Sequence, residues 1–191
     1  MTRVRPAQPA DAEALSALAA ETFPLACPPG TDPAGIAAFI AATFRPEHFL
    51  AALADPDRIV LVAEPDGAGA PGEPGPAGLL GYTLSRFGAP ADPEIAGALT
   101  TAGLGASGGV AELSKCYVRQ VAHGGAVAHA LMTATLAAFA ERGARTAWLG
   151  VNQRNERAQR FYAKHAFGRV GTKQFLVGAE LHDDFVLARA L

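Results

Sequence analysis

Three segments that follow one another decide the fold of this chain: AELSKCYV (111–118), RQVAHGGAVAHALM (119–132) and TAWLGVNQRNERAQRFYAKHAF (146–167). The first segment is typical of a strand, and the second begins with a turn of small residues and continues as a helix. The third is a buried strand followed by a helix that begins at Asn155. This alternation of strands and helices predicts an α/β or α+β protein.

The turn between the first strand and its helix contains Gly124 and Gly125. The first N–H groups of a helix have no partner inside the helix, and the helix dipole adds partial positive charge at the same end. Residues without bulky side chains let an anion come within hydrogen-bond distance of these groups. The turn therefore predicts a pyrophosphate site, although a strand-to-helix turn also uses small residues for ordinary packing.

Three separate patterns in these segments resemble the GCN5-related N-acetyltransferase (GNAT) family. The strand ends in the family's apolar-x-Val pattern, at residues 116–118. The turn, at residues 123–128, follows the pattern Gln/Arg-x-x-Gly-x-Gly/Ala. The pattern Asn-x-x-Ala-x-x-Phe-Tyr-x-x-x-Gly-Phe is represented by Asn155, Ala158, Phe161, Tyr162, Ala166 and Phe167. The last match is the most specific of the three.

The sequence departs from the family's patterns at three positions. His123 replaces the usual Gln or Arg with another hydrogen-bond donor, and Ala126 and Ala166 stand where Gly is usual. A methyl group at Ala126 crowds the place that the resemblance assigns to the phosphates, so this departure bears on cofactor affinity. The resemblance covers most of the chain in the order of its elements and is specific from Ala111 to Phe167.

The resemblance implies a single domain over residues 1–191, with a central mixed, mostly antiparallel, splayed β-sheet flanked by helices. It also implies that the chain uses acetyl-CoA. The main chain at the end of the first strand would hold the pantetheine arm, which can pair like an added strand, and the turn would hold the pyrophosphate. The cofactor-binding residues that the resemblance assigns are Cys116, Tyr117, Val118, His123, Gly124, Gly125, Ala126, Val127, Ala128 and Asn155.

Transfer of an acetyl group from a thioester to an amine needs a base for the amine proton and an acid for the departing thiolate. Tyr162 is the predicted acid: it lies seven residues after Asn155, so the two side chains share one face of the helix. Glu112 is the predicted base, since many members of the family that the sequence resembles place an acidic residue on this strand. A core role for Tyr162, an ion pair of Glu112 with Lys115, and solvent as the base are the alternatives.

The distribution of charge bears on the acceptor. Residues 1–110 carry twelve Asp and Glu against five Lys and Arg, and residues 111–191 carry eleven Lys and Arg against six Asp and Glu. Because long-range fields concentrate opposite charge, the C-terminal half favours a polyanionic cofactor and the N-terminal half a small cationic or polyamine-like acceptor. An uneven distribution of surface charge without a functional role explains the same numbers of charged residues equally well.

These observations predict an acetyl-CoA-dependent N-acetyltransferase that moves the acetyl group directly to a primary amine, without a covalent enzyme intermediate. The alternative is a module of the same fold that has lost catalysis and binds an acyl-CoA or a protein partner. Ala126 and Ala166 favour this alternative, and the presence of Asn155 and Tyr162 opposes it. An enzyme that uses a longer acyl-CoA is a third reading.

Composition excludes several other classes of protein. A net charge of −2 argues against general binding of nucleic acid, and the histidines and cysteines show no metal-ligand spacing. No run approaches the ~18 apolar residues of a membrane span. We expect a soluble cytoplasmic enzyme without a metal. The resemblance leaves a homodimer open, because many relatives form dimers.

The remaining elements are predicted from periodicity and from Pro and Gly breaks. Strands are expected at 2–5, 58–64, 79–86, 169–177 and 184–190, and helices at 9–23 and 33–54, the latter broken at Pro46. Within the three segments, the expected spans are 110–118, 125–142, 146–151 and 155–165. Two loops are expected, at 66–78 and 88–109, the second either bordering the acceptor channel or disordered.

Overall fold

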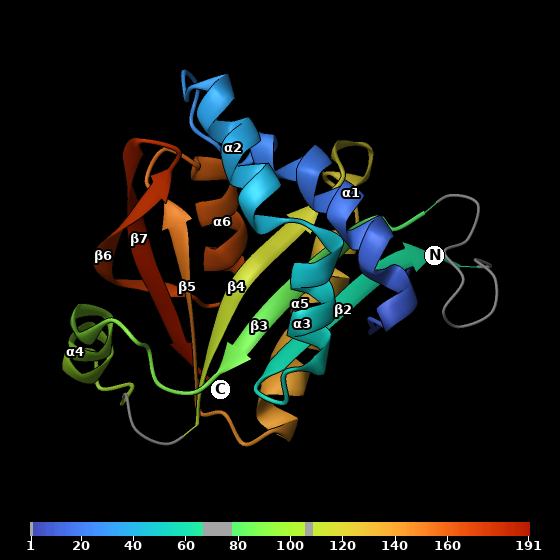
Figure 1. Ribbon diagram of the computed structural model, residues 1–191. Helices are drawn as coiled ribbons and strands as arrows, with labels where there is room; N and C mark the ends of the chain where they lie inside the picture. The colour runs from blue at the N-terminus through green and yellow to red at the C-terminus, as the bar shows by residue number, and fades with distance from the viewer. Residues whose placement is uncertain (1, 67–77, 106–108) are drawn as a thin grey trace.

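The computed structural model describes residues 2–66, 78–105 and 109–191 (Figure 1). The strands are β1 (Thr2–Pro6), β2 (Arg58–Pro65), β3 (Gly81–Phe87), β4 (Val110–Val118), β5 (Thr146–Asn152), β6 (Gly168–Val177) and β7 (Glu180–Ala190). The helices are α1 (Ala12–Thr22), α2 (Pro33–Thr43), α3 (Pro46–Ala54), α4 (Pro93–Thr101), α5 (Val127–Glu141) and α6 (Glu156–Lys164), with short 3-10 turns η1 (Pro9–Asp11), η2 (Phe23–Leu25) and η3 (Gln120–Ala122). The predicted loop at 66–78 lies almost entirely outside the described residues.

The strands form one seven-stranded sheet in the order β1-β2-β3-β4-β5-β7-β6. Every neighbouring pair is antiparallel except β4 and β5, which are parallel and pair only from Val110 to Glu112 against Thr146 to Trp148. Beyond Glu112 the two strands diverge, as Figure 1 shows. The predicted mixed, mostly antiparallel and splayed sheet is therefore confirmed.

A β-bulge in β4 decides which side chains face the divergence. Leu84 of β3 pairs with Lys115 and Ser85 pairs with Leu113, so Ser114 is an extra residue without a partner opposite it. A bulge of this kind bends the strand and increases its twist. Because cross-strand partners share a face of the sheet, the bulge puts Lys115 on the same face as Glu112, which pairs with Arg86.

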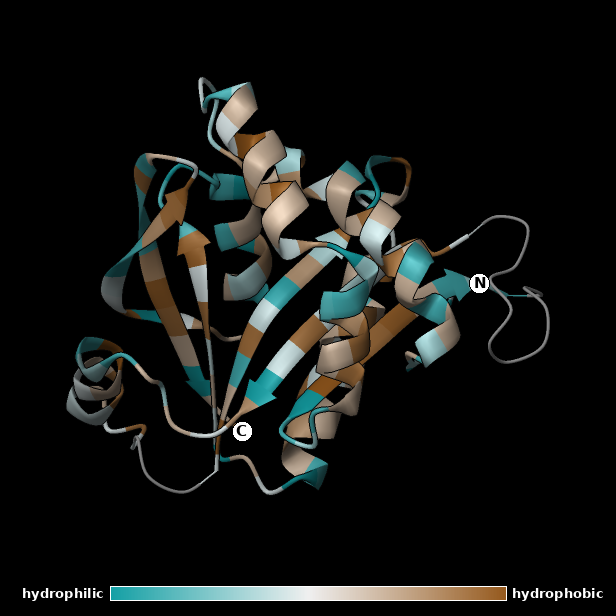
Figure 2. Ribbon diagram, viewed as in Figure 1, coloured by the Kyte–Doolittle hydropathy of each residue, from teal (hydrophilic) through white to brown (hydrophobic). Residues whose placement is uncertain are grey.

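Helices cover both faces of the sheet. Helices α1, α2 and α3 lie on one face, and α5 and α6 lie on the other (Figure 1). The core under α1 and α3 is built around Leu15, Leu18 and Tyr82, and the core under α5 and α6 around Met132, Phe139 and Leu149. In Figure 2 the strands between these layers show brown bands interrupted by white and teal ones, so they mix apolar and polar residues.

Two fully buried carboxylates near the N-terminus belong to the fold rather than to a site. Asp11 and Glu64 are 0% and 1% exposed. Asp11 accepts hydrogen bonds from Arg5 at 2.7 and 2.9 Å, and Glu64 pairs with Arg3 and Arg5. The guanidinium of Arg5 holds the pKa of Asp11 below its usual range against the opposing effect of burial. These acids tie β1 to η1 and β2.

The predicted loop at 88–109 contains helix α4, so that prediction was wrong for residues 93–101. The side chain of Asp92 caps the helix by accepting from the backbone N–H of Glu94 at 2.8 Å, and Pro93 occupies the first turn. Ile95 and Leu99 are buried against Trp148 of β5. Of the described part of this stretch, no residue lines the cleft discussed below.

Helix α2 spans from α1 to the hairpin of β6 and β7, and it touches that hairpin where two glycines meet. It is apolar along its length (Figure 2), yet none of its residues is fully buried.

No single helix in the described residues is long and apolar enough to cross a bilayer. Helices α2 and α3 reach that length only as a pair, with a bend of 46° between them.

Substitution of Gly178 by Ala should loosen α2 from the hairpin. Gly178 has a φ of +60°, and a Cβ there would lie 2.6 Å from the Cα of Gly35. The left-handed conformation and the overlap together predict a loss of about 1–3 kcal/mol in the free energy of unfolding. Urea denaturation measures this loss. The matched control is Gly97→Ala in α4, which has open space around it and should stabilise by about 0.4–1 kcal/mol; an equal gain at both positions would contradict the contact.

Candidate active site

A cleft of about 570 Å³ opens where β4 and β5 part. Its floor consists of residues 112–118 of β4 and 150–152 of β5. Its walls are formed by residues of α1, η2, the loop before α2, α2, α6, β6, β7 and the turn before α5. The strand-pairing pattern explains its position, because no strand among the described residues pairs with the main chain of β4 on the β5 side after Glu112. The cleft has two sides, one facing α2 and one facing α5 and α6.

The side that faces α5 begins at the predicted cofactor turn. Of the predicted cofactor residues, seven line the cleft: Cys116, Tyr117, Val118, His123, Gly124, Ala128 and Asn155. Gly125 and Ala126 lie on the exposed rim, and the side chain of Val127 is 6% exposed and packs into the core with Leu131. The structure therefore gathers most of the predicted set and shows that Val127 can contribute only its main chain.

The backbone conformation of the turn explains which residue must be glycine. Gly124 has a φ of +75°, in the left-handed region that glycine tolerates best. Ala126, the N-cap of α5, has a φ of −73° and a ψ of −10°, which any residue adopts without strain. The alanine that departs from the family's pattern therefore fits the turn.

Two substitutions test whether the turn requires glycine at position 124 but not at position 126. Ala126→Gly should tighten acetyl-CoA binding or leave it unchanged, because it removes only a methyl group from the rim. Gly124→Ala should weaken binding by up to about tenfold, because an alanine at a φ of +75° costs roughly 1–2 kcal/mol or forces the turn to change. Calorimetric titration of both variants measures the difference; marked weakening in Ala126→Gly would show that the methyl group is part of the site.

His123 joins the turn to α6 instead of pointing freely into the cleft. One ring nitrogen, Nε2, lies 2.8 Å from the carbonyl oxygen of Val118, and Nδ1 lies 2.7 Å from Nη1 of Arg157. Since a guanidinium only donates, Nδ1 accepts and Nε2–H donates to Val118. Both ring nitrogens are thus engaged, and the exposed cation beside the turn is Arg157, which the sequence analysis did not single out.

Asn155 starts α6, as predicted. Its side-chain oxygen accepts a hydrogen bond of 3.0 Å from the backbone N–H of Ala158. Gln159 holds the preceding loop through its Nε2, which donates to the carbonyl oxygens of Asn152 and Gln153 at 3.1 and 2.9 Å. These bonds fix the helix against β5 and so fix the direction of the aromatic residues in its last turns.

Tyr162 reaches the cleft from α6. It is 9% exposed and packs edge-on against Phe161 and Phe167, at centroid distances of 5.4 and 6.0 Å. Burial raises the pKa of its hydroxyl well above the usual value, with smaller contributions from Cys116 and Tyr117. The phenol therefore keeps its proton at neutral pH. It is both a core aromatic and a lining group of the cleft, so the two readings of the sequence do not exclude each other.

The third departure from the family's pattern, Ala166, ends α6. It has a φ of +62°, and the backbone N–H groups of Ala166 and Phe167 bond to the carbonyl oxygens of Ala163 and Tyr162 at 3.0 and 3.1 Å. This is a Schellman ending, whose left-handed residue is usually glycine. Ala166 is exposed and does not line the cleft. The unfavourable left-handed conformation of Ala166 therefore destabilises the end of α6 and does not affect the cleft.

Glu112 lies on the other side of the cleft, at the last paired position of β4 before the divergence. It is half-buried and lines the cleft together with Tyr162. Within the described residues, no ion pair joins it to Lys115.

Cys116 also lines the cleft. Burial raises the pKa of its thiol to about 12, so the thiol stays protonated and is a poor nucleophile.

An aromatic wall closes the side that faces α2. Phe23 and Phe39 stack with centroids 4.5 Å apart, Phe39 contacts Phe175 of β6 at 5.5 Å, and Phe44 contacts Tyr117 of β4 at 6.4 Å. The sequence did not predict this wall. The phenylalanines of α2 could be read only as helical periodicity, and nothing in the sequence brings them to β4 and β6.

Two further groups on this side, Lys173 and Asp184, come from β6 and β7 and face each other across the strand pair. Asp184 is 7% exposed, and its Oδ1 accepts from Nδ2 of Asn152 at 3.4 Å. Burial raises the pKa of Asp184, although Lys173 acts in the opposite direction. Asp183 is exposed on the opposite face, so only Asp184 of these two neighbouring acids is turned toward the cleft.

Within residues 2–66, 78–105 and 109–191, no group of three or more His, Cys, Asp and Glu side chains is placed to hold a metal ion.

Comparison with known proteins places the chain in a family. The model of the acetyltransferase (GNAT) family matches residues 13–167. Proteins of Mycobacterium tuberculosis and Mycobacterium bovis, each described as an uncharacterized N-acetyltransferase, are 40% identical over 181 residues, which is 95% of this chain and 98% of theirs.

Solved structures share the fold at low identity. PaiA N-acetyltransferase from Thermoplasma acidophilum, solved in complex with coenzyme A, has a TM-score of 0.73 and 16% identity, with 100% of this chain and 99% of that chain covered. NAA60 from Arabidopsis thaliana, solved in complex with acetyl-CoA, gives the same TM-score, identity and coverage. Since the family match spans most of its length, this chain belongs to the acetyltransferase (GNAT) family.

Proposed function

We propose that this protein transfers the acetyl group of acetyl-CoA directly to a primary amine inside the cleft between β4 and β5. The observation that carries the proposal is that Tyr162 and Glu112, a protonated phenol from α6 and a carboxylate from β4, line one cleft. The solved relatives that contain coenzyme A or acetyl-CoA support the choice of cosubstrate.

The pantetheine arm lies along residues 116–118 in this proposal. That stretch of β4 pairs with β3 on one edge, and no strand in the described part of the chain pairs with its other edge. Its main chain can therefore bond a linear diamide as it would an added strand. The pyrophosphate lies at the turn before α5, where the helix N-terminus and Arg157 supply positive charge. His123 then acts as a positioning residue, because it holds Arg157 beside the end of β4.

Glu112 acts as the base and Tyr162 as the acid in this proposal. Glu112 takes a proton from the acceptor ammonium, directly or through water, and leaves the neutral amine that attacks the thioester carbonyl. As the new C–N bond forms and the C–S bond breaks, Tyr162 donates its proton to the departing thiolate. The second proton of the attacking nitrogen, which is lost as the amide forms, returns to Tyr162, and Glu112 releases its own proton to solvent. Burial raises the pKa of Tyr162, so the phenol holds at neutral pH the proton that it must donate.

The structure also weakens the case for a module without catalysis. That reading relied on Ala126 and Ala166, but the first has an ordinary helical conformation and the second forms a helix ending away from the cleft. Neither residue requires a loss of the reaction.

The test is a transfer assay with the purified full chain, acetyl-CoA and a panel of primary amines. The proposal expects release of free thiol that depends on an amine, and a product whose mass has increased by one acetyl group. Binding of acetyl-CoA without transfer to any amine of the panel would support the non-catalytic module instead. The cytoplasmic location and the homodimer remain predictions of the sequence.

A further inference from the structure

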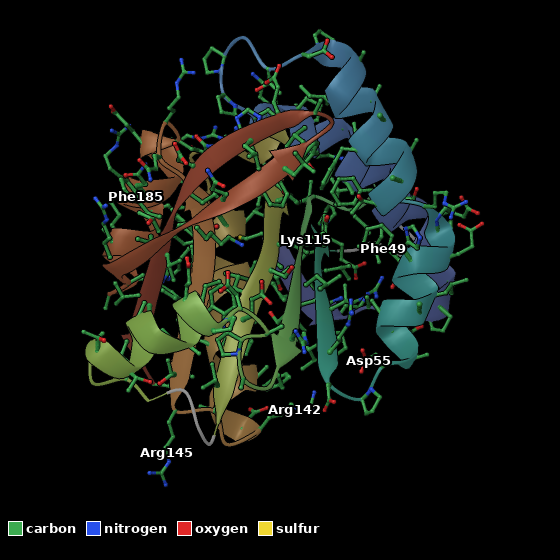
Figure 3. All side chains as sticks on the ribbon, turned by 60° about the vertical axis from the view of Figure 1, so that its left-hand side comes forward. Phe49, Asp55, Lys115, Arg142, Arg145 and Phe185 are labelled. Atoms are coloured by element: carbon green, nitrogen blue, oxygen red, sulfur yellow. The ribbon has the colours of Figure 1, made fainter. Side chains whose placement is uncertain are left out.

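The face of the sheet that is turned toward α2 carries a set of polar side chains from four strands. Register places them together: Glu112 and Lys115 lie on β4, Asn152 on β5, Asp184 on β7 opposite Asn152, and Lys173 on β6 opposite Asp184. All five line the cleft. Figure 3 shows Lys115 on the side of β4 that is turned toward α2 and α3.

The two lysines lack ion-pair partners in the part of the chain that the structure describes. Lys115 Nζ lies 5.9 Å from the ring centre of Phe44, and Lys173 Nζ lies 5.7 and 5.9 Å from those of Trp148 and Phe175. Burial lowers the pKa of Lys115, Glu112 opposes this effect, and the charges of Arg58 and Lys173 add to it. Two ammonium groups that repel each other inside a cleft are stabilised by an anion between them.

Lys173 is directed into the cleft by the absence of a side chain at Gly150. A Cβ at this position would overlap the Cε atom of Lys173 and would lie 3.4 Å from Oδ2 of Asp184. Because Gly150 has no side chain, the side chain of Lys173 can lie over β5 at this position. This arrangement is a built feature of the cleft rather than a surface lysine that happens to be near it.

The carboxylates of the cleft complement the lysines. Glu112 and Asp184 are available on the same face, so a ligand that carries one positive and one negative group meets partners of both signs. The aromatic wall of Phe23, Phe39 and Phe44 supplies an apolar surface beside them. A ligand with only positive groups would meet two lysines without gaining a counter-charge for them.

We propose that the acceptor is a small zwitterion, an amine that also carries a carboxylate and has an apolar or aromatic side chain, as an amino acid does. Its amine lies beside Glu112, its carboxylate between Lys115 and Lys173, and its side chain against the phenylalanines. This inference rests on the proposed transferase function and specifies its substrate class.

The net charge of residues 1–110 led to the different expectation of a cationic acceptor. None of the described acidic residues in that range lines the cleft, where the contributors from that range are neutral residues of α1, η2, α2 and the loop before it. Asp11 and Glu64 are already paired with arginines. The charge near the acceptor is therefore set by β4, β6 and β7.

Matched acceptors test the proposal. We would measure kcat/KM for phenylalanine, phenylalaninamide and phenylethylamine, which share an amine and a ring and differ in the carboxylate, and repeat the comparison for the leucine and methionine series. A charge-assisted contact contributes about 1.5–3 kcal/mol, so the carboxylate-bearing acceptors should be preferred by roughly 10- to 100-fold.

The lysines are tested in the same assay. Lys173→Met should lower kcat/KM for the amino acids by about tenfold, mainly through KM, and should leave the decarboxylated amines unchanged. Lys115→Met should also lower kcat/KM for the amino acids. Because Lys115 is half-buried, the thermal unfolding of this variant is measured as well. Lys164→Met, on the exposed surface of α6, is the matched control and should change nothing.

The outcomes separate the two proposals. Equal or better acetylation of the amides, of the decarboxylated amines or of spermidine would overturn the zwitterion and leave the transferase intact. An equal loss for all acceptors in Lys173→Met would overturn it too, since it would show a general defect. Failure of every amine to accept an acetyl group would count against the transferase itself.

Discussion

Tyr162→Phe should lower kcat by about 10²- to 10³-fold while changing the dissociation constant for acetyl-CoA by no more than about twofold. The substitution removes one oxygen and keeps the ring that packs between Phe161 and Phe167. The departing thiolate then loses its proton donor in a part of the cleft where burial limits replacement by water. Single-turnover kinetics with saturating acetyl-CoA would separate this chemical effect from binding.

Tyr82→Phe is the matched control. Tyr82 is fully buried and does not line the cleft, and its hydroxyl has no hydrogen-bond partner among residues 2–66, 78–105 and 109–191. Removal of that hydroxyl should leave kcat unchanged and should not destabilise the fold, because an unsatisfied buried group disappears. Wild-type turnover in Tyr162→Phe would remove the assignment of the acid, whatever the control shows.

Glu112→Gln should lower kcat/KM at neutral pH by about 10²-fold, because general-base catalysis typically contributes at least that much. The amide has nearly the shape of the carboxylate, so the cleft keeps its form. The loss should shrink as the pH rises, because more of the acceptor amine is then already neutral and needs no base. A pH profile of kcat/KM for wild type and variant measures both effects.

Glu141→Gln, at the exposed end of α5, controls for the change of net charge and should have wild-type kinetics at every pH. A small loss in Glu112→Gln that does not depend on pH would contradict the assignment. Proton removal would then fall to solvent, or to Asp184, which lies in the same cleft on the other side of the divergence.

The parts of the site that the sequence predicted are local ones. The β4 strand was expected at 110–118 and is found at Val110–Val118, and Asn155 was expected to start a helix and caps α6. Strand periodicity, a cap residue and a glycine turn each depend on a few neighbouring residues, so they can be read without knowledge of the rest of the fold. Tyr162 shares that helix with Asn155, and it lines the cleft; its role as the acid stays a prediction.

The parts that could not be predicted depend on register between distant strands. The bulge at Ser114 moves Lys115 to the face of Glu112, whereas simple alternation would have put Ser114 there. Lys173 and Asp184 reach the cleft because β7 is inserted between β5 and β6. In a sequence, a lysine or an aspartate in a polar strand is indistinguishable from a solvated one, and net charge summed over 110 residues does not report the few charges that line a cleft.

Calorimetric titration of the purified protein with acetyl-CoA decides whether the cleft beside residues 116–128 binds this cosubstrate. We expect micromolar binding at one site per chain, weakened in Gly124→Ala and retained in Tyr162→Phe. No detectable heat of binding, or binding that is indifferent to Gly124→Ala, would contradict this expectation.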